Sequence, residues 1–264
     1  MTQITKPVVL CFSGHDPSGG AGIQADIETI TSHQCHAANV ITALTEQNTS
    51  NVKEMLPQSP EAIISQAQTI LEDLPVKAIK IGLIGHEQIA KAISTILSEN
   101  PTIPVVLDPI LAAGGGASLS SNALIQSIIE LLLPRTTILT PNSLEARQLT
   151  KSNDLQSSGI KLLELGCEYV LITGSHEQST VVSNQLFHKR AVIETYNWDR
   201  LPHSYHGSGC TLASSIAALM AHDLKVETCV QEAQEYTWNS LHAAYQPGKG
   251  QHIPNRLFWM QEHV

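Results

Sequence analysis

The sequence lacks the features of membrane, secreted and zinc-binding proteins. No apolar run approaches the ~20 residues that cross a bilayer, and the first residues lack the apolar core of a signal peptide. The five cysteines are scattered and include no C-x-x-C pair, which argues against disulfides and a zinc site. We therefore expect a cytoplasmic protein with reduced thiols that does not bind membranes.

Positive charge is also scarce. The chain has 15 Lys and Arg against 24 Asp and Glu, a formal net charge of −9, which argues against nucleic acid as a partner. Phosphate would have to be bound locally, by backbone N–H groups, a metal and a few cations. The sequence contains neither a G-x-G-x-x-G dinucleotide motif nor a G-x-x-x-x-G-K-[ST] P-loop. A dinucleotide-binding fold and a P-loop enzyme are thus disfavoured.

Short β-rich runs alternate with longer helical patterns along the chain. Strands are predicted at residues 8–12, 39–44, 78–81, 105–107, 137–139 and 169–172. Helices are predicted at residues 22–33, 60–74, 87–97, 119–132, 144–149, 159–165, 211–222 and 226–245. Repeated strand–helix units indicate a mostly parallel central sheet covered on both faces, an α/β/α arrangement. No linker divides residues 1–264, so a single domain is expected.

Two weaker patterns complete the prediction. Residues around 181–182 and 190–195 flank Asn184-Gln185 and are expected to form an antiparallel pair. The apolar cluster at residues 257–260 is expected to pack against the body of the protein.

A glycine turn at His206–Thr211 precedes an apolar helical run. Gly207 and Gly209 permit unusual dihedrals and a close approach by a ligand. The free N–H groups at a helix N-terminus bind anions, most often phosphate. Cys210 sits at that end, where the pKa of a thiol is usually lowered. A glycine cap beside a buried structural cysteine explains the pattern equally well, so both interpretations stay open.

Polar residues follow the first two predicted strands. The segment SGHDPSGGAGIQAD at residues 13–26 opens a helix, with Asp26 in its first turns. Asp26 is either a surface acid that complements the helix dipole or a ligand for an amine or ring nitrogen. The run TEQNT at residues 45–49 could read the donor and acceptor edges of a heterocycle or form a turn.

Two acids follow later strands. Asp108 comes directly after residues 105–107, where a Mg²⁺–phosphate would need a carboxylate. Glu145 follows Asn142 by three residues, which is also the spacing of a helix capping box. Because ligands bind at the carboxyl ends of the strands in such sheets, these residues are expected to share one site.

These segments together resemble a known family. The motifs SGHDPSGGAGIQAD, TALTEQNT, KIG, VLDP, LTPNSLEA and HGSGCTL look like those of the hydroxymethylpyrimidine/phosphomethylpyrimidine kinases of thiamine biosynthesis, in order over nearly the whole chain. The resemblance implies a ribokinase-like α/β/α fold. It also implies two successive ATP-dependent phosphorylations, of the pyrimidine's hydroxymethyl group and then of the monophosphate.

The resemblance also implies a role for particular residues. The pyrimidine pocket would be lined by Gly14, Ala21, Asp26, Thr45, Gln47 and Leu83, with Asp26 and Gln47 reading the aminopyrimidine edge. Mg²⁺ would be held by Asp108 and Glu145, and ATP would meet Asn142, Thr173, Gly174 and Thr211. An anion hole would be formed by Gly207, Ser208, Gly209 and Cys210, with Cys210 as the catalytic base. A homodimer is expected by analogy with ribokinase-like proteins.

The chain departs from the family pattern at the phosphate-binding cations. Thr173 stands where a lysine is common, and the loop after Asp108 carries no lysine. Lys80, His176, His206 or the backbone of residues 114–116 are the candidates to compensate. Two alternatives follow: a pyridoxal or pyridoxine kinase of the same fold, which an aspartate in place of Cys210 would have favoured, and a pyrimidine-binding protein with impaired catalysis.

Overall fold

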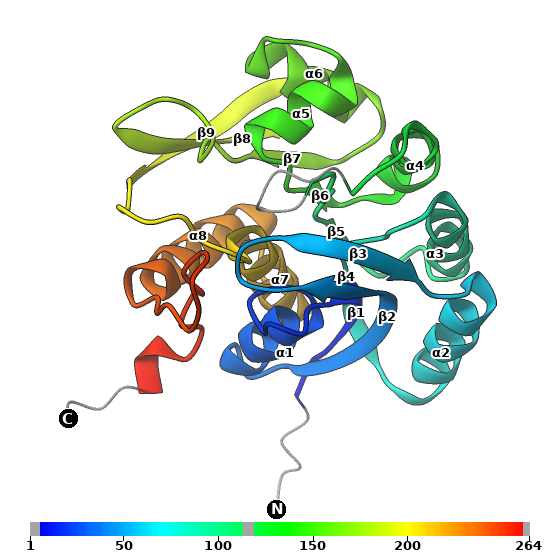
Figure 1. Cartoon of the computed structure of the whole chain (residues 1–264). Coiled ribbons are helices and arrows are strands. Elements are labelled where there is room, and N and C mark those ends of the chain that lie inside the picture. Colours follow the sequence, from blue (N-terminus) through cyan, green and yellow to red (C-terminus); the bar gives the residue numbers. More distant parts are fainter. Residues whose placement is uncertain (1–5, 113–118, 261–264) are drawn as a thin grey trace, which may run out of the picture.

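The computed structural model of the protein describes residues 6–112 and 119–260, and its strands form one mixed sheet (Figure 1). The strand order is β3-β2-β1-β4-β5-β6-β7-β8-β9. Strands β2, β1, β4, β5, β6 and β7 are parallel, while β3, β8 and β9 pair antiparallel. The strands are β1 (Val8–His15), β2 (His36–Gln47), β3 (Val52–Pro57), β4 (Val76–Ile81), β5 (Val105–Leu107), β6 (Ile138–Leu139), β7 (Tyr169–Ile172), β8 (Val181–His188) and β9 (Ala191–Asp199).

Helices cover both faces of this sheet, which confirms the predicted three-layer α/β/α arrangement (Figure 1). One face carries α1 (Gly22–Ser32), α7 (Ser208–Ala221) and α8 (Val226–His242). The other carries α2 (Pro60–Asp73), α3 (Glu87–Glu99), α4 (Asn122–Ser127), α5 (Ser143–Thr150) and α6 (Leu155–Glu164).

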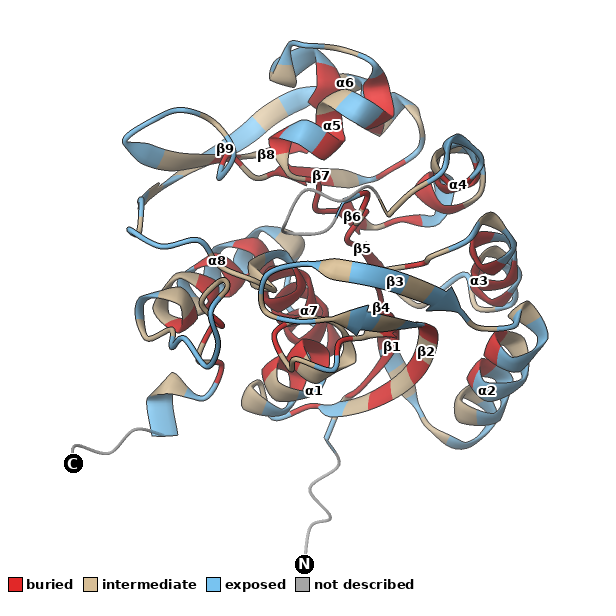
Figure 2. Cartoon of the chain, in the orientation of Figure 1, coloured by how far each residue is buried: buried red, intermediate tan, exposed pale blue. Residues whose placement is uncertain are grey.

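The core is split by the sheet into two apolar clusters. Alternate residues of β1 supply opposite faces: Leu10 and Phe12 pack with α2 and α3, while Val9 and Cys11 pack with α7. Because both faces are covered, β1 is buried along nearly its whole length, as the continuous apolar run of its sequence predicts. Helix α7 is buried at almost every position, and its small residues let it lie close to the sheet (Figure 2).

Three elements differ from their predicted form. Strand β3 was not predicted, since its residues are mostly exposed and lack a core-facing pattern. The predicted helix at residues 119–132 starts only at Asn122, and residues Ile128–Leu132 form a π-helix. The expected antiparallel pair is confirmed as β8 and β9, but its turn is at Lys189 and Arg190, with φ values of 48° and 65°.

The expected packing of residues 257–260 is confirmed only in part: the ring of Phe258 lies 5.6 Å from that of Tyr236, and Nε1 of Trp259 donates to the hydroxyl of Ser32 at 2.6 Å. Trp259 and Met260 keep 57% and 59% of their surface exposed, and the short 3₁₀ turn Phe258–Met260 contains no buried residue. The buried residues of this tail are instead Ile253, Pro254 and Arg256. The apolar run at residues 257–260 therefore did not indicate the most buried part of this tail, which includes the charged side chain of Arg256.

The described residues contain no helix that is long and apolar enough to cross a membrane. All five cysteines are buried and free of disulfides.

Candidate active site

A cavity of about 610 Å³ lies at the carboxyl ends of the parallel strands, bordered by the N-terminus of α7. It brings together most of the residues singled out from the sequence. Those that line it are Gly14, Ala21, Thr45, Gln47, Leu83, Asp108, Asn142, Glu145, Thr173, Gly207, Ser208, Gly209 and Cys210. Asp26, Gly174 and Thr211 do not line it. The volume suits a small molecule together with part of a nucleotide.

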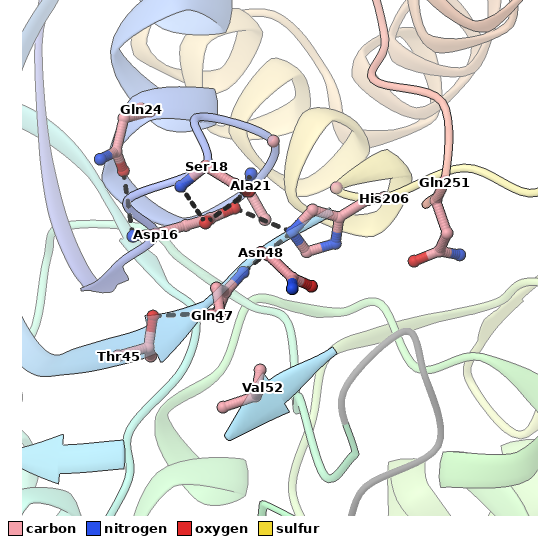
Figure 3. A network of polar contacts seen from close by, with 12 residues as sticks. Asp16, Ser18, Ala21, Gln24, Thr45, Gln47, Asn48, Val52, His206 and Gln251 are labelled. Carbon is pink, nitrogen blue, oxygen red and sulfur yellow. Dashed lines mark hydrogen bonds and ion pairs between the residues drawn. The ribbon is translucent and has the colours of Figure 1, made fainter. Parts of the chain in front are cut away.

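The loop between β1 and α1 is organised by Asp16, which sequence reasoning left without a role. Its carboxylate accepts hydrogen bonds from the backbone N–H groups of Ser18 and Ala21, at 2.8 Å each, and from the hydroxyl of Ser18 at 2.7 Å (Figure 3). Burial opposes its charge, but bonds from His206 and Ser18 dominate and lower the pKa of Asp16 to about 2. The Asp-Pro-Ser-Gly sequence was a readable signal for such a turn.

Leu83 and Gly14 form one wall of the cavity. A Cβ on Gly14 would lie 2.7 Å from Cδ2 of Leu83, so the glycine leaves room for that side chain. The carbonyl of Leu83 accepts a short hydrogen bond from the hydroxyl of Thr42 on β2, which fixes the segment after β4. These contacts give the cavity a rigid apolar side.

The amide of Gln47 lies at the end of β2, between two polar partners. Its Oε1 lies 2.9 Å from the hydroxyl of Thr45, and its Nε2 lies 3.0 Å from Nε2 of His206 (Figure 3). The same nitrogen of His206 is 2.8 Å from Oδ2 of Asp16. His206 therefore connects the β1–α1 loop, β2 and the turn before α7.

Asp26 does not line the cavity, so its contact with the pyrimidine stays a prediction. Its side chain is fully buried, and Oδ1 accepts bonds from Nζ of Lys80 at 2.8 Å and from the hydroxyl of Ser214 at 2.6 Å. Lys80 is equally buried and also donates to the hydroxyl of Ser13. Burial opposes the charge of Lys80, but the Asp26 carboxylate dominates and raises the pKa of the lysine. A buried lysine needed a partner, and Asp26 is that partner.

The turn before α7 is held tightly against the β1–α1 loop. Gly207 caps the helix with a φ of 84°, and a Cβ there would lie 1.9 Å from the carbonyl oxygen of Gly20. In the same way, a Cβ on Gly20 would lie 2.4 Å from Cδ2 of His206. Gly207 thus leaves room for the β1–α1 loop, and Gly20 leaves room for the ring of His206. The free N–H groups at the N-terminus of α7 lie at the cavity.

Cys210 is a protonated thiol in this environment, contrary to the lowered pKa expected for a helix N-terminus. Burial raises the pKa of Cys210 to about 11; Lys80 lowers it, while Asp108 and Asp26 raise it further. Cys210 is only 6% exposed, so the loss of hydration outweighs the dipole of α7.

Asp108 and Glu145 lie at the cavity with properties that suit a cation. Asp108 follows β5, and its buried Oδ2 has no hydrogen-bond partner. Burial raises the pKa of both carboxyls, and the charge of Asp108 raises that of Glu145 further. Glu145 also completes the capping box of α5, accepting from the backbone N–H of Asn142 at 2.9 Å. Within the described chain, no group of three or more His, Cys, Asp and Glu side chains could hold a metal. Two carboxylates are enough for Mg²⁺, which keeps waters and phosphate oxygens as its other ligands.

Two residues predicted to meet the nucleotide instead support the backbone. Thr211 is fully buried, donates to the carbonyl of Gly207 and accepts from Nε of Arg256 at 2.9 Å. Gly174 donates to Oδ1 of Asn184, and a Cβ there would lie 2.2 Å from the carbonyl oxygen of Ser183. Both therefore act on the cavity only through the segments they hold.

Arg256 is the buried anchor of the C-terminal segment, and nothing in the sequence marked it. Its guanidinium donates to Thr211, to the carbonyl of Gly20 at 2.5 Å and to Glu28 at 3.0 Å. It ties α1, α7 and the β1–α1 loop together beneath the glycine turn.

The cations that could replace the missing lysine differ in their placement. Lys80 lines the cavity but is engaged by Asp26, and His176 lines it from an exposed position. Arg200 also lines the cavity, but its guanidinium donates to the carbonyls of Ser175, Glu177 and Ser179. Residues 114–116 lie outside the described part of the chain.

The far end of the cavity was not anticipated from the sequence. Trp198 of β9 and Trp238 of α8 line it, with ring centroids 6.5 Å apart. Gln234 accepts hydrogen bonds from Trp198 Nε1 at 3.2 Å and from Asn184 at 2.8 Å. Only the spatial approach of β9 to α8 brings these residues together.

Comparison with known proteins identifies the family. A family described as phosphomethylpyrimidine kinase matches residues 16–255. A hydroxymethylpyrimidine/phosphomethylpyrimidine kinase of Synechococcus elongatus is 34% identical, covering 93% of this chain and 95% of that protein. The corresponding kinase of Streptomyces coelicolor is 32% identical, covering 94% of this chain and 93% of that protein.

Solved structures agree on the fold. A phosphomethylpyrimidine kinase of Clostridium difficile has a TM-score of 0.78 at 29% identity, covering 89% of this chain and all of that one. A pyridoxal kinase of Bacillus subtilis, solved as an ADP complex, has a TM-score of 0.88 at 24% identity, covering 98% of this chain and all of that one. The second likeness concerns the ribokinase-like fold alone. By its sequence, its sheet topology and its glycine turn, the chain belongs to the phosphomethylpyrimidine kinase family and is a phosphotransferase.

Proposed function

We propose that this protein phosphorylates 4-amino-5-hydroxymethyl-2-methylpyrimidine and then its monophosphate, with ATP as the donor. In the first step the hydroxymethyl oxygen gives up its proton to the thiolate form of Cys210 and bonds to the γ-phosphorus of ATP, while the bond to the bridging β–γ oxygen breaks and ADP leaves. In the second step a phosphate oxygen of the monophosphate takes the place of the hydroxymethyl oxygen. The observation that carries the proposal is one cavity lined by Gln47, Asp108 and the turn Gly207–Cys210.

The residues divide by the part of the reaction they would serve. Gln47 and Thr45 would bind the polar edge of the pyrimidine, and Gly14, Ala21 and Leu83 would enclose its ring. The backbone N–H groups at Gly207–Cys210 would stabilise charge on the transferring phosphoryl group. Asn142 and Thr173 would lie along the nucleotide, while Asp26, Gly174 and Thr211 support these segments from behind.

Mg²⁺ would be held by Asp108 and Glu145. The unpartnered Oδ2 of Asp108 and the raised pKa of both carboxyls support this assignment, because a cation between them would offset their mutual repulsion. When bound there, the ion would supply neutralisation of the phosphate charge. Asp108 also lies next to the glycine turn, since a Cβ on Gly209 would be 3.5 Å from its Oδ2.

Two further parts of the proposal concern the whole protein. A homodimer is supported by exposed apolar side chains on the β2–β3 edge, with Leu44 and Leu56 at 40% and 49% exposure. Light scattering on the purified protein tests it. A reducing, cytoplasmic location is supported by the five unpaired cysteines.

Product analysis tests the proposed activity. Incubation with Mg-ATP and the pyrimidine alcohol, followed by mass spectrometry over time, is expected to show the monophosphate first and the diphosphate later. Formation of the monophosphate alone would restrict the proposal to one step. The absence of both products, with the alcohol and with added monophosphate, would overturn it.

A further inference from the structure

Four side chains at the substrate end of the cavity form a hydrogen-bond chain whose direction can be deduced. Nε2 of His206 lies between Oδ2 of Asp16, at 2.8 Å, and the amide of Gln47, at 3.0 Å (Figure 3). On the other side of that amide, Oγ1 of Thr45 lies 2.9 Å from Gln47 and 2.9 Å from the carbonyl oxygen of His15. The protons on these atoms must be consistent along the whole chain.

The first constraint comes from Asp16. An ionised carboxylate can only accept, so Nε2 of His206 must carry a hydrogen where it faces Oδ2. A nitrogen that carries this hydrogen has no lone pair for an N–H group of Gln47. The end of the Gln47 amide beside His206 is therefore its oxygen, because an amide can present either atom at the same place and the hydrogen-bond network decides which.

The second constraint comes from Thr45 and gives the same answer. Its hydroxyl has one hydrogen, and the carbonyl of His15 can only accept, so that hydrogen goes to His15. The Thr45 oxygen can then only accept from Gln47, which requires the amide nitrogen on the Thr45 side. The chain thus runs from the Gln47 N–H through Thr45 to His15, while the Gln47 oxygen shares the hydrogen of His206.

We propose that His206 sets the polarity with which Gln47 reads the substrate. The amide retains one oxygen lone pair on the His206 side and one N–H on the Thr45 side for a ligand in the cavity. It therefore selects an edge with a donor next to His206 and an acceptor next to Thr45, an amino group beside a ring nitrogen. This inference rests on the proposed function and adds to it a specificity-determining residue that acts through Gln47.

The assigned polarity also places the reacting group. In the pyrimidine alcohol, the amino group is on the ring carbon next to the one that carries the hydroxymethyl group. With the amino group on the His206 side, the hydroxymethyl group lies towards His206 as well, and the next residue in the chain, Gly207, begins the glycine turn. The reversed amide would seat the ring nitrogen there and direct the hydroxymethyl group away from the turn.

The fixed position of His206 makes this role effective. Its backbone N–H donates to the carbonyl of His252 at 2.9 Å, and its ring occupies the space left by Gly20. The ring is 14% exposed and Asp16 is 4% exposed, so water competes little for their hydrogen bond. The imidazole cannot rotate without losing Asp16.

The test compares two isosteric replacements of His206. His206→Gln keeps an N–H donor near the position of Nε2, and His206→Met does not. The substrates are the aminopyrimidine alcohol and its 4-oxo analogue, whose edge has donor and acceptor exchanged. ADP release gives kcat/KM, and calorimetry without ATP gives Kd. Wild type and His206→Gln are expected to prefer the amino compound, while His206→Met loses up to about tenfold of that preference, mostly through KM, because reversing the Gln47 amide then breaks only its bond to Thr45.

A second pair of variants, at Thr45, tests the inference even if the His206→Met protein does not fold. Thr45→Val removes the acceptor at the other end of the amide, and Thr45→Ser keeps it, so only Thr45→Val is expected to lose a comparable part of the preference, since His206 alone then orients the amide. The inference is wrong if His206→Met or Thr45→Val keeps the wild-type preference, or if both members of a pair lose it equally. A wild type that binds the amino compound but releases no ADP contradicts the proposed function, while the Kd ratios still judge the inference.

Discussion

Cys210, the proposed base of the first step, lies in a site that disfavours its charged form. With a pKa raised to about 11 by burial and neighbouring carboxylates, only a small fraction of the thiol is ionised at neutral pH. As long as the pH is below the pKa, the thiolate fraction increases about tenfold for each unit by which the pH rises. The monophosphate substrate needs no such base, because a phosphate monoester with a second pKa of about 6 is already largely a dianion.

The two phosphorylations are therefore expected to respond differently at this residue. In the wild type, kcat with the alcohol should rise between pH 7 and 9, because the thiolate fraction increases, while kcat with the monophosphate stays nearly constant. Cys210→Ala should lower the first activity by about 10²-fold or more, the usual contribution of a general base, and the second much less. Steady-state ADP release with each substrate measures both. Equal losses on the two substrates would contradict a role for Cys210 as the base.

The element proposed to form the anion hole is the turn into α7, and its geometry depends on Gly207. A side chain there meets two separate obstacles: a φ of 84° and the Gly20 carbonyl oxygen at 1.9 Å from the Cβ position. Gly19 offers a matched control within the neighbouring loop, since its φ is 79° but nothing lies within 4 Å of its Cβ position.

Gly19→Ala is expected to lower the free energy of unfolding by about 1 kcal/mol, the cost of a left-handed conformation. Gly207→Ala should cost several times more and abolish ADP release, because the β1–α1 loop and the turn must separate. Urea denaturation and the kinase assay measure the two effects. Equal destabilisation by the two substitutions would show that the packing of Gly207 against Gly20 does not matter.

At the level of elements, the sequence predicted the parallel strands and the helices between them. The parallel strands are buried on both faces and the helices on the face towards the sheet, and each kind of burial produces an apolar pattern within the local sequence. Strand β3 escaped prediction because an exposed edge strand has no core-facing pattern. The start at Asn122 was missed because the N-cap is Ser121, whose hydroxyl accepts from the backbone N–H of Leu124. The β8–β9 turn was misplaced because Asn184 suggested a turn, whereas it is buried and binds Gly174 and Gln234.

At the level of the whole molecule, the site was predictable where one segment supplies both the residue and its setting. The turn at Gly207, the capping box of Glu145 and the position of Asp108 after its strand are of this kind. The pairing of Asp26 with Lys80, and of His206 with Asp16 and Gln47, joins residues far apart in the chain. Such pairs follow from the strand order and not from spacing, so the ion pair of Asp26 with Lys80 could not be predicted.

Steady-state ADP release with Mg-ATP, with the pyrimidine alcohol, its monophosphate and pyridoxal offered separately, distinguishes the proposed pyrimidine kinase from a pyridoxal kinase of the same fold. The account predicts turnover with both pyrimidines and a kcat/KM for pyridoxal at least about 10²-fold lower, because the Gln47 amide would lose its partner edge. Efficient turnover with pyridoxal and none with either pyrimidine would contradict the account.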